Sequence, residues 1–279
     1  MLAELANRAD RVRPAQSADG EPLWLGPPER PLYAALHRAT SGRAAYGVVL
    51  APPLLAEQPR SRRLLFEIAG ELAAQGLTCL RFDYYGTGDS GGDGKEHDLA
   101  AMYTDFDTAV AGLCESTEVT AIAVMAWRGA ALAACDWARL RKVNALVLWD
   151  PVEDGAAWLD ELESADRRER VSRNRYARGT GAGGSADDGQ LMGMPASASW
   201  RSGMGGLRLA QTTRDIRASL WAVLRNPGVA PEWAQRTFVL PPDTPRFDGE
   251  TRMDATLFLS RQLRALVGEL GRALMNMEH

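Results

Sequence analysis

The chain has 279 residues, of which 46% are hydrophobic and 24% are charged, and its formal net charge is −4. This length and composition are typical of one large α/β domain, or two small ones, with a buried core. The weakly acidic balance gives no reason to expect a nucleic-acid partner. Three cysteines without a close pair, and three widely separated histidines, predict neither a disulfide framework nor a metal site, and we expect no cofactor.

The N-terminal segment contains no apolar core followed by a small-residue cleavage site, so the sequence predicts no secretory signal. Nowhere in the chain is there an apolar run of about 18 residues, the length that crosses a bilayer. We therefore expect a cytoplasmic protein without a membrane span.

Strand-like apolar segments alternate with helical patterns along the chain. Strands are predicted over 32–39, 46–53, 77–86, 119–126, 144–150, 218–226 and 237–242. We expect the first two strands to be neighbours, joined by a turn around Ser41 and Gly42. Helices are predicted over 62–76, 98–114, 129–140 and 253–274, with Asp98 as the N-cap of the second.

Continuous apolar strands separated by helices indicate parallel βαβ units, with helices on both faces of the sheet. The alternation stops over 151–210, which contains six arginines between Arg167 and Arg178 and a glycine-rich tract over 179–190. We interpret the arginine-rich part as a solvated helix of mixed charge. The predicted organisation is 1–150 as the first part of the core, 151–210 as a partly flexible cap, and 211–279 as the rest of the core.

Four sequence segments resemble known proteins. The segment "LRFDYYGTGDSGG" (80–92) resembles the exit of the fourth strand in serine hydrolases of the α/β-hydrolase superfamily. More narrowly, "APPLLAEQPRSRR" (51–63), "LVLWDPVEDGAAWLDEL" (146–162) and "GQLMGMP" (189–195) resemble hydrolase-like proteins found beside bacterial exosortase systems. The resemblance implies an α/β-hydrolase fold, a mostly parallel doubly wound sheet of about eight strands with a cap inserted after the sixth.

The segment "AVMAWRGAALAA" (123–134) has the outline of a nucleophile elbow, a strand that turns sharply into a helix. We place the central position of the elbow at Trp127, whose indole cannot act as an acyl-transfer nucleophile. A shift by one residue brings Ala126 or Arg128 to that position, and neither is a nucleophile.

The other two members of a catalytic triad are also hard to find. The segment 240–252, where the fold would supply its histidine, contains none. Asp150 follows the sixth strand, where it is either a candidate acid or a turn residue that accepts backbone N–H bonds. We therefore predict a degenerate catalytic site in a non-hydrolytic binding or accessory protein, active in a biosynthetic or assembly system.

The predicted binding pocket lies beyond the strand ends, and its partner is a small ligand or another protein. We expect it to be lined by Pro53, Leu54, Leu55, Trp127, Arg128, Trp149 and Asp150. Trp127 and Arg128 would hold a flat or anionic ligand there, unless Trp127 is simply part of the core.

Two alternatives stay open. The first is an active serine hydrolase, esterase or acyltransferase with a relocated site built from Ser90, His97 and either Asp83 or Asp150. The second is a subunit of a larger complex, in which the segment 179–190 becomes ordered on a partner.

Overall fold

The computed structural model describes residues 20–40, 46–176, 189–225, 228, 230–244, 246–247 and 257–277, without the side chains of 171–176. Most of the glycine-rich segment 179–190, part of the segment 240–252, and the C-terminal His279 lie outside the described residues.

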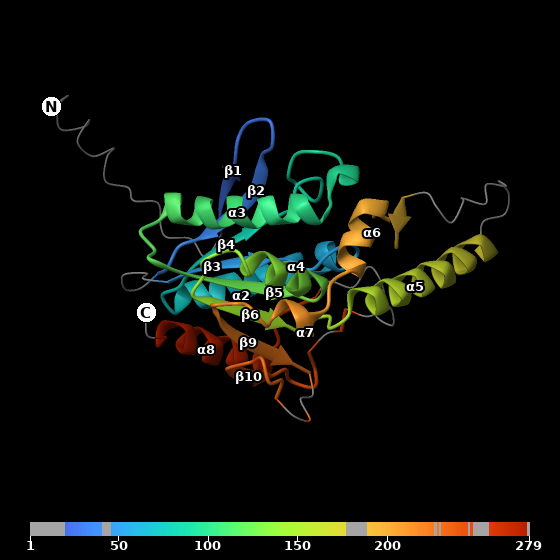
Figure 1. Cartoon of the computed structure of the whole chain (residues 1–279). Coiled ribbons are helices and arrows are strands. Elements are labelled where there is room, and N and C mark those ends of the chain that lie inside the picture. Colours follow the sequence, from blue (N-terminus) through green and yellow to red (C-terminus); the bar gives the residue numbers. More distant parts are fainter. Residues whose placement is uncertain are drawn as a thin grey trace.

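Eight strands form one sheet in the order β1-β2-β4-β3-β5-β6-β9-β10 (Figure 1). Their bounds are Glu21–Leu25 (β1), Leu32–His37 (β2), Tyr46–Ala51 (β3), Thr78–Phe82 (β4), Ala121–Trp127 (β5), Ala145–Trp149 (β6), Ser219–Leu224 (β9) and Arg236–Val239 (β10). From β4 to β10 all pairs are parallel, whereas β2 is antiparallel to both β1 and β4. The predicted mostly parallel sheet of about eight strands is thus confirmed.

The two segments expected to be neighbouring strands, 32–39 and 46–53, are not neighbours, because β4 lies between them. Leu36 pairs with Leu80 in the antiparallel β2–β4 ladder, and Val49 pairs with the same residue from the parallel side. The chain therefore skips one strand between β2 and β3, and the turn predicted around Ser41 and Gly42 lies outside the described residues. The edge strand β1 was not predicted, because three of its five residues are exposed and it lacks a clear apolar alternation.

Helices cover both faces of the sheet. Their bounds are Glu57–Ala74 (α2), Leu99–Ser116 (α3), Gly129–Ala138 (α4) and Arg261–Met275 (α8). In Figure 1, α3 and α4 lie on one face, and α2 and α8 lie on the other. The Asp98 side chain accepts a hydrogen bond from the Ala101 N–H, which confirms the predicted N-cap of α3.

A long insertion separates β6 from β9, and its described residues add no strand to the main sheet. It contains Gly155–Tyr176 (α5), Gln190–Leu191 (β7), Met194–Pro195 (β8), Ala198–Gly205 (α6) and Leu209–Thr212 (α7). In Figure 1, α5 begins beside the carboxyl end of the sheet and projects away from the body of the molecule. A short 3-10 helix, Gly94–Glu96 (η2), lies in the loop between β4 and α3.

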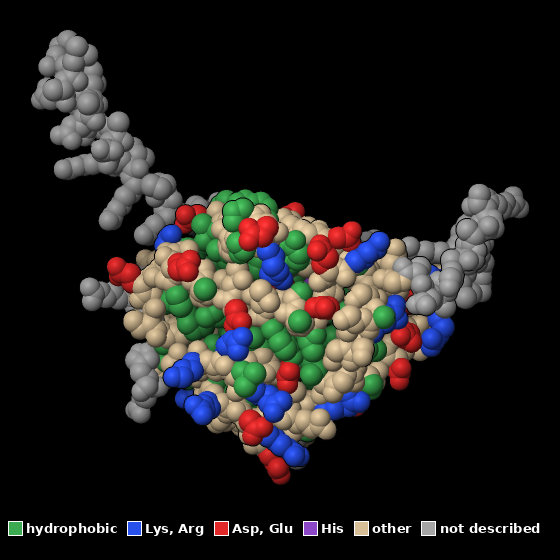
Figure 2. All heavy atoms as spheres, turned by 45° about the horizontal axis from the view of Figure 1, so that its top comes forward, with side chains coloured by type: hydrophobic (Ala, Val, Ile, Leu, Met, Phe, Trp, Pro, Cys, Tyr) green, Lys and Arg blue, Asp and Glu red, His purple; other side chains and the backbone are tan. Residues whose placement is uncertain are grey.

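Strand alternation divides the core into two layers, one on each face of the sheet. In β5, Val124 and Ala126 pack toward α3 and α4, whereas Met125 and Trp127 pack toward α2 and α8. The face shown in Figure 2 carries acidic and basic side chains that are interspersed. Within the described ranges, no helix is long and apolar enough to span a bilayer.

Candidate ligand-binding site

The sharp bend between β5 and α4 falls at Arg128. Its backbone adopts φ 53° and ψ −126°, a left-handed conformation that is strained for any residue with a side chain. In serine hydrolases of the resembled fold, the nucleophile occupies this strand-to-helix turn. The structure therefore places Arg128 at the central position of the bend, whereas the sequence pattern predicts Trp127, the preceding residue, at that position.

The shift by one residue follows from strand pairing. The parallel ladder between β5 and β6 continues through Trp127, which pairs with Trp149, so Trp127 is still part of the strand. The Arg128 N–H then donates to the Trp149 carbonyl as the chain turns away. Gly129 follows, and a Cβ on it would meet Cη2 of Trp158 at 2.5 Å, so the glycine permits α5 to pack closely over the bend.

Trp127 and Trp149 belong to the core below the bend. Both are fully buried on the α2–α8 face, and their rings stack with centroids 5.4 Å apart at 28°. Neither side chain lines the cavity described below. The observation favours the core-filling interpretation of Trp127 that the sequence analysis had left open.

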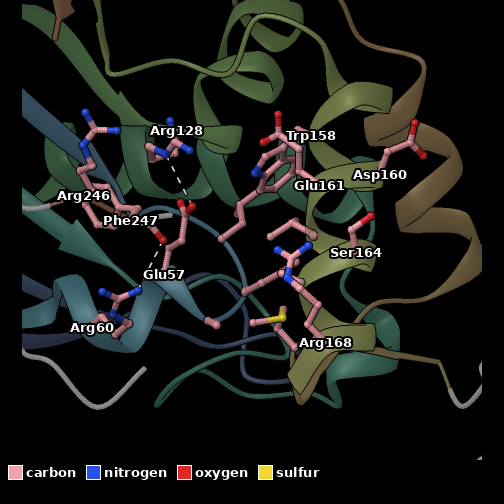
Figure 3. A pocket seen from close by; sticks show the side chains of 16 residues that line it. Glu57, Arg60, Arg128, Trp158, Asp160, Glu161, Ser164, Arg168, Arg246 and Phe247 are labelled. Carbon is pink, nitrogen blue, oxygen red and sulfur yellow. Dashed lines mark hydrogen bonds and ion pairs between the residues drawn. The ribbon is translucent and has the colours of Figure 1, made fainter. Parts of the chain in front are cut away.

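A cavity of about 860 Å³ opens above Arg128, at the carboxyl end of the parallel strands (Figure 3). Its walls come from the loop after β3, the first turn of α2, the bend, the helix α5, the turn between β7 and β8, and the segment after β10. The lining residues are Leu54, Leu55, Ala56, Glu57, Arg60, Arg128, Trp158, Asp160, Glu161, Leu162, Ser164, Ala165, Arg168, Met192, Arg246 and Phe247. Of the seven residues expected to line the pocket, Leu54, Leu55 and Arg128 do so, whereas Pro53, Trp127, Trp149 and Asp150 do not.

A chain of alternating charges runs from the cavity into the protein through Arg128. Its Nε atom lies 3.5 Å from Glu57 Oε1, and its Nη1 donates to the Asp150 carbonyl at 3.1 Å. The Asp150 carboxylate accepts a hydrogen bond from Arg225 Nε at 2.7 Å and lies 3.7 Å from Arg128 Nη1. Asp150 thus sits in a turn with φ 46° and binds two guanidinium groups, which is the setting of a structural anion.

Glu57 is the buried acid of the cavity. The residue is 6% exposed, and burial raises its pKa from 4.5 to about 7, against the opposing charge of Arg128. Its Oε2 atom has no hydrogen-bond partner among the described residues. This carboxyl group therefore exchanges its proton near neutral pH, directly beside the guanidinium at the bend.

Arg60 lies one helical turn after Glu57, on the same face of α2. It is 7% exposed, and its Nη1 donates to the Phe247 carbonyl at 3.4 Å. Its Nε and Nη2 atoms are buried without a hydrogen-bond partner in the part of the chain that the structure describes. Arg246 and Phe247 come from the segment after β10, where a hydrolase of this fold would supply its histidine.

The structure does not assemble Ser90, His97 and Asp83 into a proton relay. The Ser90 hydroxyl donates to the backbone carbonyl of Asp83 at 2.6 Å and accepts from the Tyr33 N–H, so it closes a loop. The Asp83 carboxylate binds Arg62 at 2.6 Å and the backbone N–H of Asp89 at 3.0 Å.

His97 is held apart from both, in an aromatic environment. Its ring stacks on the Trp200 ring with the centroids 6.5 Å apart, and its centroid lies 5.5 Å from that of the Tyr84 ring. Burial lowers the pKa of His97 to about 4, so the imidazole is neutral at physiological pH. It lines a separate cavity of about 120 Å³ and is absent from the lining of the large one.

Glu57 and Arg60 are not among the predicted site residues, because both precede residue 62, where the sequence pattern predicts the helix to begin. In the structure, the helix α2 begins at Glu57, earlier than the predicted start at residue 62. The Gln58–Pro59 pair favours extended backbone before the proline, yet proline is tolerated in the first helical turn, where its missing N–H has no intrahelical partner. That proline was the available signal for an earlier helix start.

Comparison with solved structures defines the class of fold. The esterase Pf2001 of Pyrococcus furiosus is 13% identical, with a TM-score of 0.59 over 94% of this chain and 92% of that chain. Est1E from Butyrivibrio proteoclasticus, solved with ferulic acid bound, is 15% identical, with a TM-score of 0.56 over 91% of this chain and 97% of that chain. XC6422 from Xanthomonas campestris, a serine hydrolase without lid, is 15% identical, with a TM-score of 0.53 over 94% and 98%.

These similarities, at low identity and nearly full coverage, show that the chain has the α/β-hydrolase fold. No protein-family model and no curated protein matches the sequence. Function must therefore be argued from the site itself.

Proposed function

We propose that the chain is a non-hydrolytic binding protein, in which the cavity above Arg128 is the binding site. The observation that carries the proposal is the guanidinium at the strained bend. A guanidinium is protonated at every physiological pH and offers only hydrogen-bond donors, so it cannot attack an acyl carbon. It is, however, well suited to bind an anion or a carbonyl oxygen.

The other groups of a hydrolase triad are also missing from the described lining of the cavity. No histidine is among the lining residues, so no imidazole stands ready to accept a proton from a nucleophile. The serine that does line the cavity, Ser164, lies on α5, and its hydroxyl accepts a hydrogen bond from Arg167 at 2.9 Å. Nothing in this arrangement activates a hydroxyl group.

The size and chemistry of the cavity support a ligand-binding role. Ligand pockets typically measure about 300 to 1,000 Å³ and combine apolar walls with a few convergent polar groups. This cavity falls in that range and has apolar side chains, including Trp158 and Phe247, around Glu57, Arg60 and Arg128. Figure 3 shows these polar groups on the α2 and bend side of the cavity, opposite the side chains of α5.

The proposal is tested with the purified protein, a p-nitrophenyl butyrate assay and a fluorophosphonate probe. We expect hydrolysis at the buffer rate and no labelled serine, because no nucleophile occupies the bend. Labelling that maps by mass spectrometry to a serine, and that disappears together with activity in Ser90→Ala or Ser164→Ala, would show an active hydrolase and overturn the proposal.

The resemblance to hydrolase-like proteins beside bacterial exosortase systems supports an accessory role in such a system, within the cytoplasm. Pull-down of tagged protein from cells that express an exosortase gene cluster tests this role. We expect specific capture of a product of that cluster, and we expect the capture to be lost when residues 179–190 are deleted. Capture that is unchanged by the deletion would show that the contact with the partner lies outside residues 179–190. Absence of capture would leave a small ligand in the cavity as the binding partner.

A further inference from the structure

The inner end of the cavity carries one more positive than negative charge. Of the groups that line this end, the guanidinium groups of Arg60 and Arg128 are positive and the carboxyl group of Glu57 is negative. Asp150 and Arg225, which do not line the cavity, pair with each other. The excess grows when Glu57 takes up its proton. A site of low exposure with an unneutralised guanidinium attracts an anion, because the cost of leaving the charge unpaired is high there.

Several polar atoms at this end of the cavity lack partners. Glu57 Oε2, Arg60 Nε and Arg60 Nη2 are all buried and make no hydrogen bond to any described residue. The Arg128–Glu57 contact at 3.5 Å is longer than a good N–H···O bond, and Arg128 Nε is likewise without a hydrogen-bond partner there. Orphaned buried donors are rare in native proteins, so three unsatisfied guanidinium nitrogens around one cavity indicate a ligand that accepts hydrogen bonds.

Elsewhere the wall of the cavity has an apolar part and a polar part. The apolar part is formed by Leu54, Leu55, Trp158, Leu162, Met192 and Phe247, and the polar part by Asp160, Glu161, Ser164, Arg168 and Arg246. Trp158 is 4% exposed and Phe247 is 6% exposed, so these rings are held in place by the surrounding structure. A ligand that fits the inner end and this apolar part has a charged head and an apolar body.

Resting on the proposed binding function, we propose that the cavity takes an amphipathic monocarboxylate, with its carboxylate between Arg60 and Arg128 and its apolar body against Trp158 and Phe247. Two guanidinium groups match a carboxylate because each presents planar N–H donors to its oxygens. One negative charge balances the excess when Glu57 is ionised. A protonated Glu57 donates a hydrogen bond to the same carboxylate.

The test compares phenylbutyrate with phenylbutyramide by isothermal titration calorimetry at pH 7. The two compounds share an apolar body and differ in the charge of the head group. We expect the carboxylate to bind at least 10-fold tighter than the amide, because only the carboxylate neutralises the guanidinium pair. Arg60→Gln should remove this preference, whereas Arg63→Gln, on the outer surface of the same helix and paired with Glu67, should keep it.

Each outcome tests either the carboxylate inference or the proposed binding function on which that inference rests. Equal affinity for the amide and the carboxylate overturns the carboxylate inference and leaves a binding protein for neutral ligands. Absence of binding by either compound overturns the inference, and serine labelling in the fluorophosphonate assay separately overturns the binding function. If Arg60→Gln does not fold, Arg128→Lys serves instead, since lysine keeps the charge and loses the planar donor pair, and we expect a 3- to 10-fold weaker preference.

Discussion

Arg128 Nε lies 3.5 Å from Glu57 Oε1, so the residue at the strained strand-to-helix bend faces a buried carboxyl group on the first turn of α2. The two residues come from neighbouring loop regions at the carboxyl end of the sheet, after β5 and after β3. In a serine hydrolase these two regions supply the nucleophile and part of the oxyanion hole. Here they supply an ion pair.

Glu57 should make the stability of the protein depend on pH. Its pKa is about 7 in the folded protein and 4.5 ordinarily, so its contribution to stability is fully present below pH 4.5 and is lost as the pH rises through about 7. The free energy of unfolding that Glu57 contributes below pH 4.5 and loses well above pH 7 is on the order of 3 kcal/mol. We expect the stability of the wild type relative to Glu57→Gln to fall from pH 5 to pH 8, as measured by urea unfolding at each pH.

The comparison with Glu57→Gln cancels other titrating groups, including Asp105, whose pKa is raised to about 6, and His97. A relative stability that stays constant across this pH range would mean that Glu57 is ionised throughout and that Arg128 fully compensates its burial.

Arg128→Ser should not create an esterase. The substitution introduces a hydroxyl group at the bend, but none of the described residues that line the cavity is a histidine whose imidazole would accept its proton. We expect p-nitrophenyl butyrate hydrolysis at the wild-type background and a loss of about 2 kcal/mol of stability, because Glu57 and Asp150 each lose a charged partner. Arg225→Ser is the control, since it removes an Asp150 partner without changing the bend. Turnover in Arg128→Ser that a fluorophosphonate abolishes would show that the site still holds a base.

Trp127→Ala should destabilise the protein strongly. Trp127 is fully buried and stacked on Trp149, so its truncation leaves a large cavity in the core and costs about 4 kcal/mol in the free energy of unfolding. Trp24→Ala is the control because Trp24 is 64% exposed, and its cost should stay below about 1 kcal/mol. Urea unfolding followed by circular dichroism measures both. A cost for Trp127→Ala as small as the control would argue for a pocket role over a core role.

Gly129→Ala should disturb the packing of α5 over the bend. The added Cβ would lie 2.5 Å from Cη2 of Trp158, a contact that forces the tryptophan or the helix to move and costs about 2 kcal/mol. Gly70→Ala, on α2, is the matched control, because its Cβ meets nothing within 4 Å and alanine stabilises a helix by about 1 kcal/mol. Thermal unfolding should therefore shift in opposite directions for the two variants. A shift in the same direction would mean that the protein accommodates a larger residue at the bend freely.

Local sequence patterns were sufficient for most of the secondary structure. Apolar runs identified seven of the eight strands of the sheet, and Asp98 marked the start of α3. These signals depend on side-chain periodicity and capping, which act within a few residues. The absence of a histidine from 240–252, and of a nucleophile from 126–128, was equally plain from the sequence.

The order of the strands and the exact residue at the bend required the tertiary structure. Pairing between β5 and β6 continues through Trp127, and a one-residue difference in ladder length sends that side chain into the core and leaves Arg128 at the bend. Ladder length depends on contacts between strands that are distant in sequence, and no local pattern encodes it.

The sequence by itself determined that this protein has an α/β architecture, that positions 126–128 hold no serine or cysteine, and that the segment 240–252 holds no histidine. Only the tertiary structure decided that Glu57, Arg60, Arg128 and Phe247 surround one cavity. These residues come from three separate segments, and their proximity, the raised pKa of Glu57 and the unpaired guanidinium nitrogens all arise from packing. The physical reason is that burial and long-range electrostatics depend on the assembled sheet, cap and helices together, whereas periodicity and composition are properties of each segment alone.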